Sequence, residues 1–379
     1  MKLVSRTTIA AVEAQLRDLA NQPPNFSLQI PKDIAHAAAG GGAAAVQLLI
    51  SWAQQQNLPT LRTYLTAGKP QQVEEFVSYL HGIIAVLISS AAYDNKTKTD
   101  LMPSLRSAAL QRLEVLQGVR PRNAMRGPDF DLLCFDHLNR GAPFLLYRPG
   151  ALQPRDRHEF MAVTRIVLQA IVPAARLRDL PSDLTEALGG ILFETFRNTA
   201  DHARRDLAGN VLTRSVRGIH ARRYEPRAEF LPQITEGYEP LQRYCERMRP
   251  DGNSRWLQFI ELSIFDSGPG FAQAASGKPI SELSIEEERA IVSDCFLRGR
   301  TSKRRAGFGE GLPLVIRLLR RHRGFLRLRT GRLSLHADLS TGGNEVSPAF
   351  ESWVPAGYQA APPVTGSLLT IILPLDPVE

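Results

Sequence analysis

Apolar residues along the chain group into short alternating runs and helical stripes. In the first 150 residues these patterns predict strands that alternate with helices, which indicates an α/β module. The expected strands are 26–30, 61–65, 130–135 and 144–147, and the expected helices are 43–56, 73–92 and 101–116. Three glycines at 40–42 lack the Lys and Ser/Thr of a phosphate-binding P-loop, so we interpret them as a flexible break in a helix.

A proline- and glycine-rich stretch at 149–154 marks the predicted boundary between two domains, 1–150 and 151–379. Beyond it, Asp183 is the expected N-cap of a long helix that extends to about residue 205, with Glu186 completing a capping box. Residues 207–250 are expected to be irregular. The other expected helices are 158–171, 284–297 and 312–322, and the expected strands are 256–265, 325–328, 333–337 and 368–373.

Three polar residues share one face of the long helix. Glu194, Asn198 and Asp201 follow one another at spacings of four and three residues, so their side chains lie in line. They present a carboxylate, a carboxamide and a second carboxylate, as the handling of a metal-bound triphosphate requires. A solvated helical face uses the same residue types, so the meaning of this line depends on the rest of the chain.

Two glycine-rich segments follow this helix. The first, Phe-Asp-Ser-Gly-Pro-Gly-Phe at 265–271, places Asp266 at the end of a strand, and the second is Gly-Phe-Gly-Glu-Gly-Leu at 307–312. Glycine lets a backbone approach a ligand closely and adopt positive φ, and a helix N-terminus favours anions. The glycines that we single out for ligand binding are Gly268, Gly270, Gly307, Gly309 and Gly311.

The three motifs, in this order, resemble those of the GHKL or Bergerat-fold ATPases. This superfamily includes DNA gyrase, the MutL and MORC proteins, the large heat-shock chaperones and the sensor histidine kinases. The resemblance covers about residues 181–375 and implies a fold of the α/β (α+β) class: a Bergerat-type helical layer on a mixed β-sheet, preceded here by a smaller α/β domain. It also implies that the chain binds ATP with Mg²⁺.

The resemblance assigns a role to each candidate residue. Asn198 would give Mg²⁺ its side-chain oxygen, and Glu194 would orient or deprotonate the attacking water. Asp201 would support the nucleotide site, as in the gyrase, MutL and chaperone branch. Asp266 would accept a hydrogen bond from the amine of adenine, where guanine would present a second acceptor.

The glycine loop and the segment before it would bind the phosphates. In the superfamily a mobile lid occupies the place of residues 284–305. Lys303 or Arg300 of this segment could neutralise the terminal phosphate, or either could be a solvated charge of the lid. We expect this lid to be mobile without nucleotide and ordered with it. Glu310 departs from the pattern, because a carboxylate repels phosphate and must point away.

Composition and charge add limits to this interpretation. Of the 379 residues, 43% are hydrophobic and 22% charged, as in an ordinary globular protein. No apolar run reaches the ~18 residues that a membrane span needs, no leader opens the chain, and the three cysteines are isolated, so we expect a cytoplasmic protein without membrane contact. Between residues 298 and 332 there are twelve lysines or arginines and one acid, which would suit a triphosphate and leave nucleic acid open as a partner.

We therefore expect a Mg²⁺-dependent ATPase that uses ATP to drive a conformational or assembly change. A protein partner would bind the N-terminal domain, and a homodimer is left open. One alternative is a serine or histidine kinase of the same superfamily, although only 39 residues separate the His158-Glu159 pair from Asn198, too few for a two-helix phosphoacceptor hairpin. The other is a nucleic-acid clamp of MutL or MORC type, which would need a further domain after the ATP-binding one.

Overall fold

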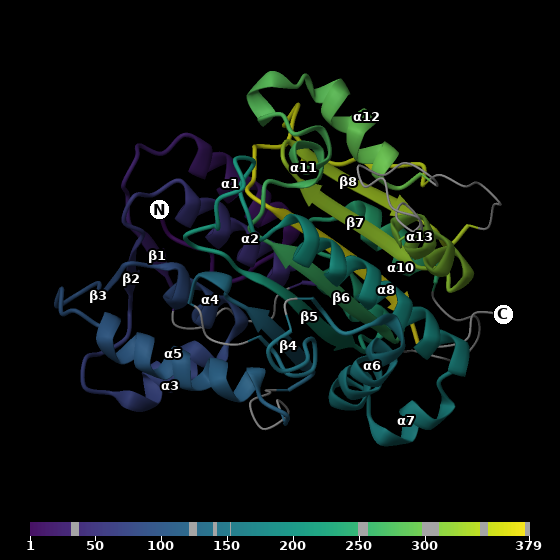
Figure 1. Ribbon diagram of the computed structural model, residues 1–379, viewed down its shortest axis with the longest axis horizontal. Helices are drawn as coiled ribbons and strands as arrows, with labels where there is room; N and C mark the ends of the chain where they lie inside the picture. Colours follow the sequence, from purple (N-terminus) through teal and green to yellow (C-terminus); the bar gives the residue numbers. More distant parts are fainter. Residues whose placement is uncertain are drawn as a thin grey trace.

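The structure is a computed structural model that describes residues 1–31, 38–120, 127–138, 142–151, 153–248, 257–297, 311–341 and 348–375. It contains a parallel sheet and a larger antiparallel sheet, both covered by helices (Figure 1), and this confirms the α/β prediction at the level of class. The parallel sheet has the order β1-β2-β3. Its strands are β1 (Leu28–Ile30), β2 (Thr60–Thr63) and β3 (Ala91–Asp94).

Seven strands form the larger sheet, in the order β4-β5-β6-β10-β7-β8-β9, and every neighbouring pair is antiparallel. The expectation of a mixed sheet is therefore wrong for the strands that the structure describes. They are β4 (Asp129–Cys134), β5 (Arg217–Tyr224), β6 (Phe259–Asp266), β7 (Phe325–Thr330), β8 (Leu333–Asp338), β9 (Glu351–Ser352) and β10 (Ser367–Pro374). Every residue of β6, β7 and β10 is buried. A strand in this position must be covered on both faces.

Three helices pack on one face of this sheet: α6 (Arg157–Ile171), α8 (Ser182–His202) and α13 (Gly311–Arg321). Figure 1 shows α8 alongside β6, with α6 on one side of it and α13 on the other. Side chains alternate along a strand, so Ile260, Leu262 and Ile264 of β6 face this helical layer and share its core. The short α7 (Ala174–Asp179) connects α6 to α8.

The N-terminal part covers the opposite face through α1 (Ile9–Ala20) and α2 (Gly41–Gln54), and α2 lies against β6 and β10. Several polar groups on that face form hydrogen bonds across the contact. The carboxylate of Glu13 accepts hydrogen bonds from Arg327 at 2.9 Å and Arg329 at 2.8 Å, and all three side chains are almost completely buried. Glu261 likewise accepts a hydrogen bond from the backbone N–H of Gly40 at 2.8 Å.

The domain boundary at 149–154 stays a prediction, but two findings bear on how the parts are joined. Strand β4 precedes the boundary and pairs with β5 of the larger sheet. The hydrophobic core of the N-terminal part also includes Phe265 of β6 and Leu368 of β10. The two predicted regions therefore share buried surface rather than being linked only by the chain.

The N-terminal helices differ from the prediction at two points. The single helix expected at 73–92 is divided into α3 (Pro70–Ser78) and α4 (Leu80–Ile88), and its last residues belong to β3. The break is at Tyr79, whose backbone is extended at φ −86° and ψ 144°. A helix follows as α5 (Met102–Gln117), as expected. The glycines at 40–42 begin α2 rather than interrupt it, with Gly40 in the left-handed region at φ 77°.

Three further expectations are wrong. Residues 144–147 form a turn with one isolated β-bridge at Tyr147, not a strand. Helix α8 begins at Ser182, so Asp183 lies inside its first turn instead of capping it. The stretch 207–250 contains β5, α9 (Leu231–Ile234) and α10 (Glu239–Arg247). Strand β5 has no hydrophobic pattern that a prediction could use, because two of its buried positions are Arg217 and His220, which pair with acidic residues.

The remaining helices after β6 are α11 (Phe271–Ser276) and α12 (Ile285–Cys295). Ser284 and Glu287 form a capping box at the start of α12, and Glu288 is fully buried in an ion pair with Arg332 at 2.9 Å. The first half of the expected lid is therefore an anchored helix. None of the helices in the described part of the chain is long and apolar enough to cross a membrane.

Candidate functional site

Asp266 is the last residue of β6 and is buried on the face of the sheet that α6, α8 and α13 cover. Only 7% of the residue is exposed, and desolvation raises the pKa of its carboxyl from 3.8 to about 6. The backbone N–H of Gly268 donates to its Oδ1 at 2.9 Å, and the N–H of Ser367 and the charge of Arg217 also favour the ionised form. A buried carboxylate with spare acceptor capacity suits recognition of a ligand donor.

The turn after Asp266 packs against the end of α8. A Cβ added to Gly268 would lie 2.6 Å from both the Cα and the Cβ of Ala203, the residue that ends this helix. Gly270 has φ 86°, and a Cβ there would lie 2.8 Å from Oγ1 of Thr330. Both glycines are therefore required by the local geometry, and Gly268 brings the second motif against the helix that carries the first.

The first motif lies along α8. Glu194 is half-buried; burial raises the pKa of its carboxyl, and the nearby charges of Arg197 and Arg157 oppose this rise. Asn198 is also half-buried, and among the residues that the structure describes its side chain makes no hydrogen bond. Asp201 pairs with Arg197, at 3.6 Å between Oδ2 and Nε.

The third motif begins α13, and its last glycine lies against Glu194. A Cβ added to Gly311 would lie 2.6 Å from Oε2 of Glu194, so a side chain at this position would displace the carboxylate. Pro313 stands in the first turn of α13, where its missing N–H has no intrahelical partner to lose. Gly307 and Gly309 lie outside the described residues, as does Lys303. The structure thus joins the first motif to the second through Gly268 and to the third through Gly311.

A buried network behind Asp266 escaped the sequence analysis. Arg217 of β5 is 1% exposed and donates from Nε and Nη2 to Asp136, at 2.8 Å each. Its Nη1 donates to the hydroxyl of Tyr147 at 3.1 Å and lies 3.5 Å from Oγ1 of Thr199 on α8. Arg217 is also the sheet partner of Asp266. No local pattern could reveal this network, since Asp136 is 81 residues from Arg217.

Two hydroxyl residues complete the surroundings of Asp266. Ser367 is its register partner on β10, and Thr330 is the register partner of Ser367 on β7. Their hydroxyl oxygens lie 3.3 Å apart, and Oγ1 of Thr330 accepts a hydrogen bond from the backbone N–H of Phe271 at 3.1 Å. The ends of β6, β7 and β10 thus gather a carboxylate and two hydroxyls beside the glycine turn.

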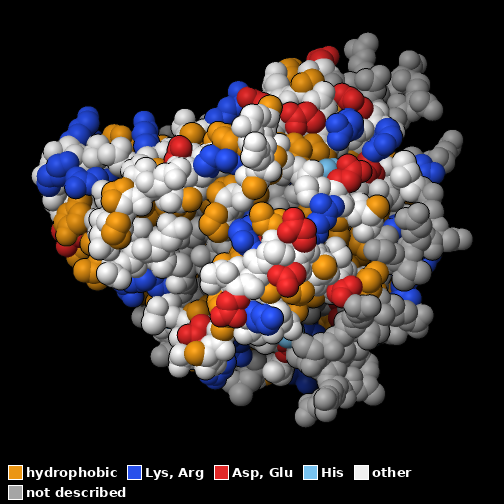
Figure 2. All heavy atoms as spheres, turned by 90° about the horizontal axis from the view of Figure 1, so that it is seen from above, with side chains coloured by type: hydrophobic (Ala, Val, Ile, Leu, Met, Phe, Trp, Pro, Cys, Tyr) orange, Lys and Arg blue, Asp and Glu red, His pale blue; other side chains and the backbone are white. Residues whose placement is uncertain are grey.

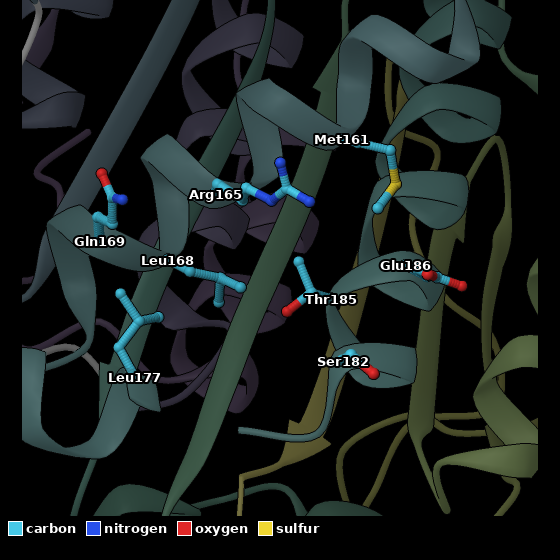
Figure 3. Close-up of a pocket in the computed structure, with 8 residues that line it drawn as sticks. All are labelled: Met161, Arg165, Leu168, Gln169, Leu177, Ser182, Thr185 and Glu186. Atoms are coloured by element: carbon cyan, nitrogen blue, oxygen red, sulfur yellow. The ribbon is translucent and has the colours of Figure 1, made fainter. Parts of the chain in front are cut away.

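A groove of about 300 Å³ opens elsewhere, between α6, α7 and α8 (Figure 3). Its polar lining includes Arg165, Thr185 and Glu186, and none of the motif residues lines it. Glu186 is two helical turns before Glu194 on α8, so this groove is distinct from the place where the motifs meet.

The basic residues of the expected phosphate region include two groups: those on β7 and in the turn after it, and those at 298–305. Arg327 and Arg329 are buried against Glu13, and Arg332 pairs with Glu288, so these three serve the fold. The basic residues at 298–305 lie outside the described residues. On the face drawn in Figure 2, Lys and Arg gather at the end formed by the N-terminal part, while charges of both signs alternate over the rest.

The His158-Glu159 pair is at the start of α6. Glu159 is held in a capping box with Asp156 and accepts a hydrogen bond from Arg155 at 2.8 Å, while His158 is exposed. The carboxylate of Glu159 therefore binds groups at the start of α6 rather than the neighbouring His158.

Among the described residues no cluster of three or more His, Cys, Asp or Glu forms a metal-binding group. The chain was also compared with known proteins: no protein-family model matches it, and neither a curated protein nor a solved structure resembles it significantly.

Proposed function

We propose that this protein binds ATP with Mg²⁺ where α8, the turn after β6 and the start of α13 meet, and hydrolyses it to drive a conformational or assembly change. The observation that carries the proposal is the contact between Glu194 and Gly311, which joins residues 117 positions apart into one site with the sequence order of the GHKL motifs. A helical layer of α6, α8 and α13 on a sheet that ends in Asp266 is consistent with a Bergerat fold.

Asp266 would select adenine. Its buried carboxylate would accept a hydrogen bond from the exocyclic amine, while the carbonyl of guanine would leave two acceptors facing each other. An unpaired buried acceptor costs ~1–3 kcal/mol, and more when charged. Gly268 and Gly270 let the turn after Asp266 pack closely against Ala203 and Thr330, because neither residue carries a side chain.

Glu194 would orient and deprotonate the attacking water. Burial raises the pKa of this carboxyl, which makes it a better base, and the charges of the neighbouring Arg197 and Arg157 oppose this rise. A bound Mg²⁺ would neutralise phosphate charge and keep most of its ligands as water and phosphate oxygens. Asn198 is suited to be the side-chain ligand of Mg²⁺, since this half-buried amide makes no hydrogen bond among the described residues.

The experiment that tests the proposal is incubation with Mg²⁺ and ATP labelled at the terminal phosphate. Release of free labelled phosphate supports hydrolysis, whereas label retained on the protein would support the kinase alternative. If neither signal is seen and the protein does not bind nucleotide, the proposal is refuted. Two variants separate the roles. Asn198→Ala should lose Mg²⁺-dependent affinity, while Glu194→Ala should bind nucleotide and lose ~10²–10⁴-fold in turnover.

The N-terminal part would transmit the change. It contacts the face of the sheet opposite to the proposed nucleotide site, through Glu13 of α1 and through α2. We therefore assign it the regulatory or partner-binding role. Limited proteolysis with and without a non-hydrolysable ATP analogue measures whether nucleotide alters this contact, and identical patterns would contradict transmission through it.

A further inference from the structure

Arg157 lies against the helix that carries the proposed catalytic glutamate. It is the first residue of α6, and its Nη2 is 3.2 Å from the place that a Cβ of Gly190 would take. Gly190 precedes Glu194 by four residues, and Asn198 follows four residues later. Positions at this spacing share a helix face, so the guanidinium of Arg157 stands at the head of the line formed by the two motif residues.

Two consecutive glycines make this approach feasible. A glycine inside a helix costs ~1 kcal/mol relative to alanine, so a pair of them needs a packing reason. A Cβ on Gly189 would lie 2.5 Å from Sδ of Met161 on α6, and one on Gly190 would lie 3.2 Å from Cδ1 of Leu318 on α13. The glycines therefore let α6 and α13 close on α8 one turn before Glu194.

Arg157 differs from its basic neighbours in having no partner among the residues that the structure describes. Arg155 and Arg148 both pair with Glu159, at 2.8 Å and 2.9 Å. Within the same described residues Arg157 makes no hydrogen bond or ion pair, although its charge is close enough to lower the pKa of Glu194. A cation at the first position of a helix is also unfavourable toward the helix dipole. Arg157 is exposed, so solvent hydrates its charge, and an anion bound beside it would offset the unfavourable interaction with the dipole.

We propose that Arg157 binds the terminal phosphate of the triphosphate and positions it beside Glu194. Arginine suits this role, since its fork of N–H donors matches phosphate oxygens and its charge is permanent. The inference rests on the proposed function and narrows it, because it makes the site selective for a nucleoside triphosphate over a diphosphate. It also predicts that a cation from a different helix opposes the rise in the pKa of Glu194 that burial causes.

The test compares Arg157→Gln with a matched control, Arg165→Gln. Arg165 is two turns further along α6, where it lines the groove beside Thr185 and Glu186 (Figure 3). Calorimetry with Mg²⁺ measures binding of ADP and of a non-hydrolysable ATP analogue. We expect Arg157→Gln to weaken binding of the analogue about tenfold or more and leave ADP unchanged, Arg157→Lys to restore part of the loss, and Arg165→Gln to bind both like wild type.

The pH profile of phosphate release supplies a second readout. Removing the cation raises the pKa of Glu194, so the acid limb of turnover should move to higher pH in Arg157→Gln and stay in place in Arg165→Gln. If wild type binds neither nucleotide, the proposed function fails first. If wild type binds both and Arg157→Gln keeps its affinity for the analogue and its pH profile, or loses ADP and analogue equally, the assignment of Arg157 alone is wrong.

Discussion

Asp266→Asn removes a buried negative charge and keeps the size and one acceptor oxygen of the side chain. Asparagine resembles the protonated acid. Comparing the variant with wild type therefore measures the free-energy cost of ionising the buried carboxyl of Asp266 in the folded protein. The difference between a pKa of 3.8 and one of about 6, at about 1.4 kcal/mol per pH unit, is about 3 kcal/mol. We therefore expect the variant to be about 3 kcal/mol more stable than wild type at pH 8, with ATP affinity at least about tenfold lower.

The sign of the pH dependence follows from the raised pKa. The folded protein holds the proton of Asp266 more tightly than the unfolded chain does. The stability from this protonation is complete below pH 3.8 and is lost as the pH rises through about 6. When the pH is lowered from 8 to 5, the unfolding free energy of wild type should therefore rise by about 1.4 kcal/mol relative to that of Asp266→Asn, since pH 5 is about one unit below the folded pKa.

Urea unfolding at pH 5 and pH 8, with calorimetry of ATP binding, measures these quantities. Glu261→Gln is the matched control, since Glu261 is a buried carboxylate on the same strand but the opposite face. It accepts hydrogen bonds from Gly40, Tyr224 and Ser263, so its replacement should destabilise the protein. An Asp266→Asn variant that is less stable than wild type at pH 8 would refute the desolvation argument, and unchanged ATP affinity would refute the adenine anchor.

Three other substitutions have defined outcomes. Gly311→Ala places a Cβ 2.6 Å from Oε2 of Glu194, so phosphate release should fall about tenfold or more; an unchanged rate would separate this contact from turnover. Gly268→Ala meets the backbone of Ala203 at 2.6 Å and should lower the unfolding free energy by about 1–3 kcal/mol, measured in urea; equal stability would mean that the turn can move. Glu13→Gln removes the negative charge that two buried arginines share and should cost about 3–5 kcal/mol by the same assay, whereas a loss below about 1 kcal/mol would show that the pairing contributes little.

Local patterns predicted most elements of the larger sheet and its helices. The apolar run of β10 and the helical stripe of α13 are visible in sequence because each element buries its own hydrophobic side chains. Strand β5 was not predicted, because it buries charged side chains as well as hydrophobic ones. Its Arg217 and His220 have the residue types of an exposed segment, but they are buried beside Asp136 and Asp131, at 2.8 Å and 2.7 Å. Pairing of this kind depends on sheet register, which no short window of sequence contains.

Within the candidate site, some features follow from the local sequence and others depend on how distant elements pack. The alignment of Glu194, Asn198 and Asp201 needed only the period of a helix, so the sequence was sufficient to predict it. Arg157 carried no signal, because its nearness to Glu194 depends on how α6 crosses α8 at a pair of glycines.

The sequence by itself determined the class of the fold, the helix that presents the polar line and the strand that ends in Asp266. These depend on spacing within one element, where a side chain's direction follows from the backbone period. The tertiary structure alone decided that Gly311 lies against Glu194, that Gly268 lies against the end of α8, and that Asp266 is buried enough to raise its pKa to about 6. Burial and contact between distant residues arise only when separate elements pack, because both depend on which surfaces exclude water together.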